Sequence, residues 1–151
     1  MRLLIISAAA LAFAVPVTAH VTVWPKQSIA SAREKYAIRV PTEKQVDTIR
    51  IEVRFPAGLK VNAFEQMPGW TTELMRDEAG ATVGARWTGK LPPMQYAEFG
   101  LLAVNPPADG EIVWTATQYY ADGTQVSWSG LPGSKSPAPR VVISKAPAGT
   151  R

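Results

Sequence analysis

Short segments of alternating hydrophobicity, separated by prolines and glycines, limit the fold of this chain more than any other feature. The 151 residues include 13 prolines and 11 glycines, which interrupt the chain too often for long helices. In residues 47–55 the apolar side chains Ile49, Ile51, Val53 and Phe55 alternate with charged ones. A period of two with a charged outer face is typical of a half-buried antiparallel strand.

Similar segments recur along the chain and predict about nine short strands. They cover residues 21–24, 34–40, 47–55, 59–64, 70–75, 81–87, 96–104, 111–120 and 124–128, and residues 140–144 can add a last one. No repeat and no internal linker divides them, so we expect one domain over residues 20–145. Many short strands joined by turns favour an all-β fold, an antiparallel β-sandwich. Residues 146–151 are expected to form a flexible tail.

The first 19 residues have the composition of a signal peptide. Arg2 precedes an apolar run over residues 3–13, and Val17-Thr18-Ala19 is a small-residue cleavage motif. We therefore expect cleavage after Ala19 and a periplasmic or secreted product. A cut after Ala12-Phe13-Ala14 also satisfies the small-residue rule, and it would leave His20 inside the mature chain.

His20 is the single histidine of the chain, and cleavage after Ala19 would make it the first residue. Its free α-amino group and its ring Nδ1 could then close one chelate ring around a metal ion. An internal histidine cannot do this. The alternative is a surface histidine without a role at a frayed terminus.

The composition excludes several classes of function. The chain has no cysteine, which rules out disulfides, thiolate metal sites and a blue-copper centre. The net charge of +4 comes from scattered basic residues, unlike the dense basic stripe of a nucleic-acid-binding protein. No second apolar stretch reaches the ~20 residues of a transmembrane helix, so none is expected in the mature chain. With one histidine and no singled-out carboxylate pair, we expect a protein that is not an enzyme.

Glu34 stands out among the carboxylates because of its position in its strand. It shares the phase of Tyr36, Ile38 and Val40, the apolar face of residues 34–40. A carboxylate facing inward is costly unless it is paired, hydrogen-bonded or bound to a metal. Cu(II) prefers nitrogen and oxygen donors in a tetragonal arrangement, which makes Glu34 a candidate partner of His20. Alternatively, Glu34 lies at the fraying start of its strand and faces water.

Trp128 shares one face of its strand with Val126. Packing in the core is the usual role of such a tryptophan. A second possibility is that its ring covers a metal site and limits the access of water.

These positions belong to a set of motifs through which the chain resembles the YcnI-like domains, exported bacterial copper-binding proteins. The motifs span nearly all of residues 20–130: His20-Val-Thr-Val-Trp-Pro, Glu34-Lys-Tyr-Ala-Ile-Arg-Val-Pro-Thr-Glu-Lys, Pro68-Gly69-Trp70, Trp87-Thr-Gly, Gln118-Tyr-Tyr-Ala-Asp-Gly and Val126-Ser-Trp-Ser-Gly. The resemblance implies a cupredoxin-like or fibronectin-like β-sandwich with a single-histidine brace for Cu(II). The implied metal ligands are His20 and Glu34, with Trp128 close by. The C-terminal membrane anchor of some relatives is not expected here.

The function expected from this resemblance is Cu(II) binding for storage, buffering or delivery outside the cytoplasm, with other copper-handling proteins as partners. The methionines Met67, Met75 and Met94 are scattered, and they do not form a cluster suited to Cu(I). The alternative is a β-sandwich that binds carbohydrate or a protein partner without a metal. An exposed row of aromatics, with His20 far from Glu34, would favour it; the aromatics available are Trp24, Trp70, Trp87, Trp114, Tyr119 and Tyr120.

Overall fold

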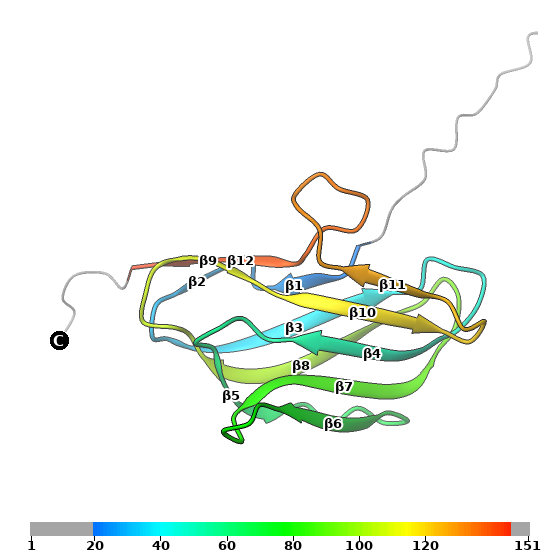
Figure 1. The fold of residues 1–151 in the computed structure, drawn as a ribbon, viewed down its shortest axis with the longest axis horizontal. Coiled ribbons are helices and arrows are strands. Elements are labelled where there is room, and N and C mark those ends of the chain that lie inside the picture. The colour runs from blue at the N-terminus through cyan, green and yellow to red at the C-terminus, as the bar shows by residue number, and fades with distance from the viewer. Residues whose placement is uncertain (1–19, 146–151) are drawn as a thin grey trace, which may run out of the picture.

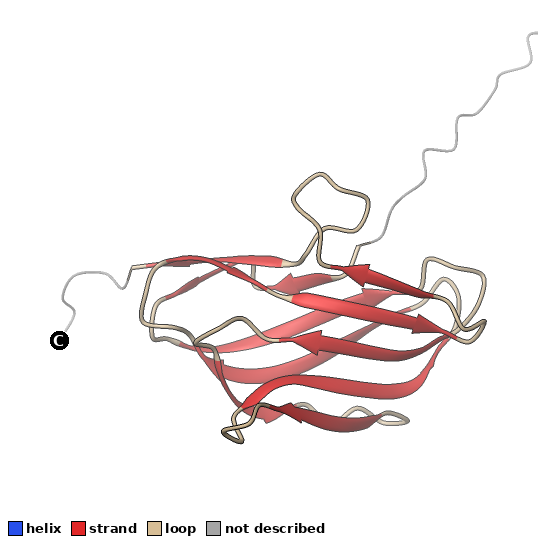
Figure 2. Cartoon of the chain, viewed as in Figure 1, coloured by secondary structure: helices blue, strands red, loops and turns tan. Residues whose placement is uncertain are grey.

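Twelve β-strands and no helix make up residues 20–145, the part of the chain that the computed structural model describes (Figures 1 and 2). One sheet has the order β1 (Thr22–Trp24), β3 (Arg33–Pro41), β8 (Tyr96–Val104) and β5 (Lys60–Phe64). A second has the order β11 (Gln125–Trp128), β10 (Thr115–Tyr120), β4 (Thr48–Arg54), β7 (Thr82–Leu91) and β6 (Thr71–Arg76). A small third sheet joins β2 (Gln27–Ile29), β12 (Arg140–Ser144) and β9 (Gly110–Val113).

Every strand pair is antiparallel except β2 with β12, so the predicted all-β sandwich is confirmed. The strand count is higher than the expected nine for three reasons. Residues 140–144, the possible last strand, form β12, and residues 27–29 form the short strand β2. The predicted strand 111–120 breaks at Trp114 into β9 and β10 of different sheets. The predicted signal peptide and tail, residues 1–19 and 146–151, lie outside the described residues. Within the described part, no helix is long and apolar enough to cross a membrane.

The hydrophobic core fills the space between the two larger sheets. Alternate residues of β3 and β4 are buried there, as their period of two predicts. Trp87 of β7 packs against Phe99 of β8, with ring centroids 4.9 Å apart. This pair joins the two sheets through aromatic surface, which contributes strongly to core stability. Because the chain has no cysteine, packing of this kind holds the sandwich together.

A β-bulge in β4 corrects one detail of the expected pattern. In the pairing of β4 with β10, Tyr119 is level with Arg50 and Tyr120 with Thr48, so Ile49 is an extra residue in β4 and the alternation reverses there. Ile49, predicted to face inward, is exposed, whereas Thr48 is fully buried. The bulge therefore brings a hydroxyl group into the interior, near one end of the sandwich.

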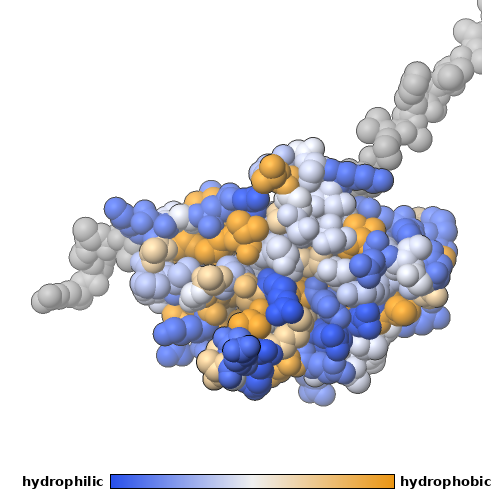
Figure 3. Space-filling model, in the orientation of Figure 1, coloured by the Kyte–Doolittle hydropathy of each residue, from blue (hydrophilic) through white to orange (hydrophobic). Residues whose placement is uncertain are grey.

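Hydrophobic residues also reach the surface, where hydrophilic ones divide them into separate patches (Figure 3). The most exposed large ones include Met94, Leu131 and Tyr96. Leu131 lies in the loop between β11 and β12, which projects from the sandwich close to the start of the described chain (Figure 1). This loop forms one side of the region around His20.

Candidate metal centre

His20 lies at the end of β3, next to the last residue of that strand. In the antiparallel pair of β1 and β3, Thr22 is level with Arg39. The same register, continued by two residues, places His20 level with Pro41. His20 is half-buried, so its ring is partly shielded while one side remains open to solvent.

Trp128 comes from the other sheet, and the structure brings it to His20. The two ring centroids are 5.5 Å apart, with the planes at 62°. Trp128 is almost fully buried at the end of β11, which returns from β10 through a tight turn at Asp122 and Gly123. Since β1 and β11 are both edge strands, the contact joins the two sheets at one side of the sandwich. Trp128 therefore packs in the core and also covers His20.

Glu34 is not beside His20, and this corrects the predicted pairing of the two residues. Glu34 is seven residues before Pro41 on the same strand, which at ~3.3 Å per residue is about 23 Å. Its inward phase was expected correctly, because Tyr36, Ile38 and Val40 are buried. The carboxylate is satisfied by hydrogen bonds: the Ser28 hydroxyl donates to Oε2 at 2.6 Å and the Lys35 N–H donates to Oε1 at 3.1 Å.

His20 affects the pKa of the Glu43 carboxyl group. Glu43 follows Pro41 by two residues, in the loop between β3 and β4. Partial shielding from water raises the pKa of Glu43, and the charge of His20 acts in the opposite direction. Burial, followed by the charge of Glu43, raises the pKa of Tyr120 to about 12. Glu43 thus shares one electrostatic environment with His20 and Tyr120.

The sequence contains a signal for Glu43 that strand phase alone did not reveal. If Val21 and Val23 of β1 are matched with the buried residues Val40 and Ile38 of β3, His20 falls at the C-terminal end of β3. A carboxylate just beyond that end is then the natural partner. Glu43 is the first carboxylate after the strand.

A buried polar network supports the end of β3. The Gln118 amide nitrogen donates to the Pro41 carbonyl oxygen at 2.9 Å and to the Thr48 hydroxyl at 2.7 Å. The hydroxyls of Thr48 and Thr42 are 3.0 Å apart. The Trp128 indole nitrogen donates to the Gln118 Oε1 at 3.3 Å. This network fixes the backbone on which Glu43 is carried and the ring that covers His20.

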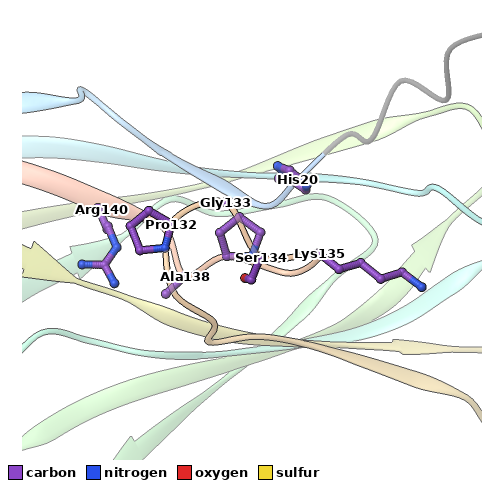
Figure 4. Close-up of a pocket in the computed structure, with 8 residues that line it drawn as sticks. His20, Pro132, Gly133, Ser134, Lys135, Ala138 and Arg140 are labelled. Atoms are coloured by element: carbon purple, nitrogen blue, oxygen red, sulfur yellow. The ribbon is translucent and has the colours of Figure 1, made fainter.

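Two open grooves flank His20. One has a volume of about 530 Å³ and lies between His20 and the loop over residues 132–138, with Arg140 at its end (Figure 4). The other, of about 470 Å³, runs over β1 and β3 from His20 to Trp24, Arg39 and Tyr96. His20 is therefore accessible from both sides, although Trp128 covers part of it.

The site combines nitrogen and oxygen donors. In residues 20–145, no three side chains of histidine, cysteine, aspartate or glutamate gather closely enough to hold a metal ion. The candidate donors are the imidazole of His20, level with Pro41, and the carboxylate of Glu43, two residues after Pro41 in the loop that follows β3. Such a pair suits Cu(II) once a third donor is added.

The aromatics that could serve a metal-free binding module are mostly internal. Trp87, Trp114 and Tyr120 are buried, and Trp24 is exposed. Trp70 is partly buried and packs against Phe99. His20 is far from Glu34, as that alternative requires, but these aromatics do not form an exposed row within the described residues.

Comparison with known proteins identifies the family of this chain. The family model described as "Domain of unknown function (DUF1775)" matches residues 20–143. The copper-binding protein CutI of Bacillus subtilis strain 168 is 32% identical over 127 residues, which are 83% of this chain and 62% of CutI. The chain thus spans less than two thirds of the length of this relative.

Solved structures support the same fold. An uncharacterized protein from Nocardia farcinica with an immunoglobulin-like fold is 26% identical, with a TM-score of 0.72 over 82% of this chain and 97% of that one. A cohesin module from a Clostridium perfringens family 33 glycoside hydrolase has a TM-score of 0.56 at 11% identity, covering 84% and 97% of the two chains, and shows a likeness of fold alone. The predicted resemblance to YcnI-like domains is confirmed, and the chain belongs to the DUF1775 family.

Proposed function

We propose that this protein binds Cu(II) outside the cytoplasm and stores, buffers or delivers it. The observation that carries the proposal is the convergence of His20, Glu43 and Trp128 at one end of the sandwich. The similarity to CutI, a protein named for copper binding, supports the choice of metal. Binding, rather than a catalysed reaction, is the activity that these groups suit.

The proposed ligands form a single-histidine brace. Cleavage after Ala19 frees the α-amino group of His20, which binds copper together with ring Nδ1. The carboxylate of Glu43 supplies an oxygen donor, in the role that the sequence had suggested for Glu34. Cu(II) favours four donors in a plane, so these three leave one position for a ligand from outside the chain.

Trp128 and Gln118 hold this arrangement without binding the metal. The Trp128 ring covers His20 on the interior side and keeps water away from it. Gln118 fixes both the indole and the Pro41 carbonyl. We infer that the loop with Glu43 is held in place before copper arrives, which lowers the entropic cost of binding.

Isothermal titration of the protein that begins at His20 tests the brace. We expect one Cu(II) ion per chain. A matched protein with one glycine before His20 keeps the imidazole and loses the chelating amine, so its affinity should fall by at least about tenfold. Equal affinity of the two proteins would refute the brace.

A pair of carboxylate variants tests the assignment of Glu43. Glu43→Gln should weaken Cu(II) binding and change the hyperfine splitting of the copper electron paramagnetic resonance spectrum. Glu34→Gln is the matched control, because it removes a partly buried carboxylate from the distant end of β3 and should leave both unchanged. Weaker Cu(II) binding in Glu34→Gln, with unchanged binding in Glu43→Gln, would show that Glu34 and not Glu43 is the ligand.

A further inference from the structure

The outer face of the first sheet next to His20 has a regular arrangement of side chains. The register places Thr22, Arg39 and Glu98 in one row across β1, β3 and β8. Tyr96 is level with Pro41 in the adjacent row, the row that His20 continues. These rows form the floor and walls of the groove of about 470 Å³ that begins at His20.

Arg39 is the centre of this groove and is held in place from three sides. Its Nε donates to the Glu98 Oε1 at 2.8 Å. Its guanidinium carbon is 5.6 Å from the centroid of the Trp24 ring and 5.7 Å from that of Tyr96. The terminal nitrogens Nη1 and Nη2 make no hydrogen bond within the described part of the chain. Arg39 therefore presents a fixed, planar pair of donors toward solvent.

Around Trp24, which lines the groove, cations outnumber carboxylates. The Lys26 ammonium is 4.9 Å from the Trp24 ring centroid, and burial, followed by the charge of Arg39, lowers the pKa of Lys26. Glu98 is the carboxylate that pairs with Arg39. Two cations thus share the surroundings of Trp24 with one carboxylate beside them, so an added anion would relieve their repulsion.

We infer that this groove binds a small carboxylate-bearing ligand through the terminal nitrogens of Arg39, next to His20. A carboxylate matches the planar fork of a guanidinium with two parallel hydrogen bonds. The cations next to Trp24 and Tyr96 occupy positions over the rings that a stacked sugar would need, so the groove suits an anion better than a neutral carbohydrate.

The position of the groove gives this ligand a role in copper handling, and that part of the inference rests on the proposed function. The brace leaves one position of Cu(II) for an external donor, and carboxylate oxygen is a suitable one. His20 and Arg39 line the same groove, so a ligand held by Arg39 could supply that oxygen donor. Copper could then arrive or leave as a carboxylate complex.

A titration of the metal-free protein with malonate tests the groove independently of copper. We expect saturable changes in the nuclear magnetic resonance signals of the Arg39 Nε–H and Trp24 Nε1–H groups, with a Kd of about 1 mM or tighter. Arg39→Gln should weaken malonate binding by at least about tenfold, and Arg39→Lys should weaken it as well, because the planar fork is lost. Sulfate, which is tetrahedral, should bind more weakly than malonate.

Arg50→Gln is the matched control for this titration. Arg50 also stacks on a tyrosine, with its guanidinium carbon 3.7 Å from the Tyr119 ring centroid. The Nε of Arg50 lies 3.5 Å from Oε1 of Glu52. Arg50 is on β4, in the sheet opposite to the one that carries Arg39. Equal losses in Arg39→Gln and Arg50→Gln, no saturation, or equal binding of sulfate would each overturn the inference.

A second measurement separates this inference from the proposed function. Malonate added to the Cu(II)-loaded protein should shift its electron paramagnetic resonance spectrum, and the shift should disappear in Arg39→Gln. A protein that binds malonate but no copper would refute the proposed function alone. A protein that binds copper but no malonate would refute the groove alone.

Discussion

The indole nitrogen of Trp128 donates a hydrogen bond to Oε1 of Gln118 at 3.3 Å, and both side chains are almost completely buried. The amide nitrogen of the same glutamine donates to the carbonyl oxygen of Pro41 and to the hydroxyl of Thr48. One side chain therefore joins β10 and β11 of one sheet to the end of β3 in the other. This link keeps the ring that covers His20 at a fixed position relative to Glu43.

Replacing Gln118 with leucine should destabilise the protein and weaken copper binding together. The substitution preserves volume but leaves the Trp128 N–H without a partner in the interior, at a cost of about 1–3 kcal/mol. Urea unfolding of the metal-free protein measures this cost, and calorimetry measures the affinity. Gln125→Leu, which changes an exposed glutamine on β11, should affect neither. Unchanged unfolding of Gln118→Leu would show that the network does not hold the site.

Trp128 should report copper binding through its fluorescence. Paramagnetic Cu(II) quenches nearby indoles, and the Trp128 ring is 5.5 Å from that of His20. Added Cu(II) should therefore quench the emission of the wild-type protein, and Trp128→Phe should lose a large share of that quenching. Trp70→Phe is the control, because Trp70 packs on Phe99 and does not line either groove beside His20. Equal loss in both variants would place the copper elsewhere.

Much of the fold follows from local sequence patterns, and the departures have specific physical causes. The period of two in residues 47–55 predicts a half-buried strand correctly. It cannot reveal the bulge that buries Thr48 and exposes Ile49, because the partner of the buried Thr48 hydroxyl is Gln118, 70 residues away in the sequence. In the same way, nothing in residues 111–120 marks the change of sheet at Trp114.

The site was only partly predictable for a related reason. The position of His20 at a cleavage motif, together with the family motifs, pointed to His20 and Trp128, and these two rings are in contact. Strand phase indicated that Glu34 faces inward, but phase does not give the distance between two strands' ends. The distance from His20 to Glu34 depends on the register of β1 against β3, which places His20 at the end of β3 that leads to Glu43. Glu34, at the other end of β3, accepts a hydrogen bond from Ser28.

Two tyrosines should make the protein less stable in strong alkali. Burial raises the pKa of Tyr36 and Tyr120 to about 12, from an ordinary value of 10.0. The unfolded chain loses these protons near pH 10, while the folded chain keeps them, so stability is lost as the pH rises from about 10 toward 12. An absorbance titration near 295 nm should show two of the four tyrosines ionising late. Four equal ionisations near pH 10 in the folded protein would contradict this.

Glu43→Gln should raise the stability of the metal-free protein at neutral pH, although it weakens copper binding. Shielding from water raises the pKa of Glu43 above its ordinary value of 4.5, so the charged carboxylate is less favourable in the folded state than in the unfolded chain. A neutral glutamine removes this penalty at neutral pH.

The advantage of Glu43→Gln should disappear as the pH falls below about 4.5, because Glu43 is then protonated in both states. Thermal unfolding of the metal-free protein at pH 7 and at pH 4 measures the difference. Added Cu(II) should reverse the order at pH 7, since the wild-type protein gains more stability from the bound ion. A metal-free variant less stable than the wild type at pH 7 would mean that Glu43 stabilises the fold, rather than being kept at this position for the metal.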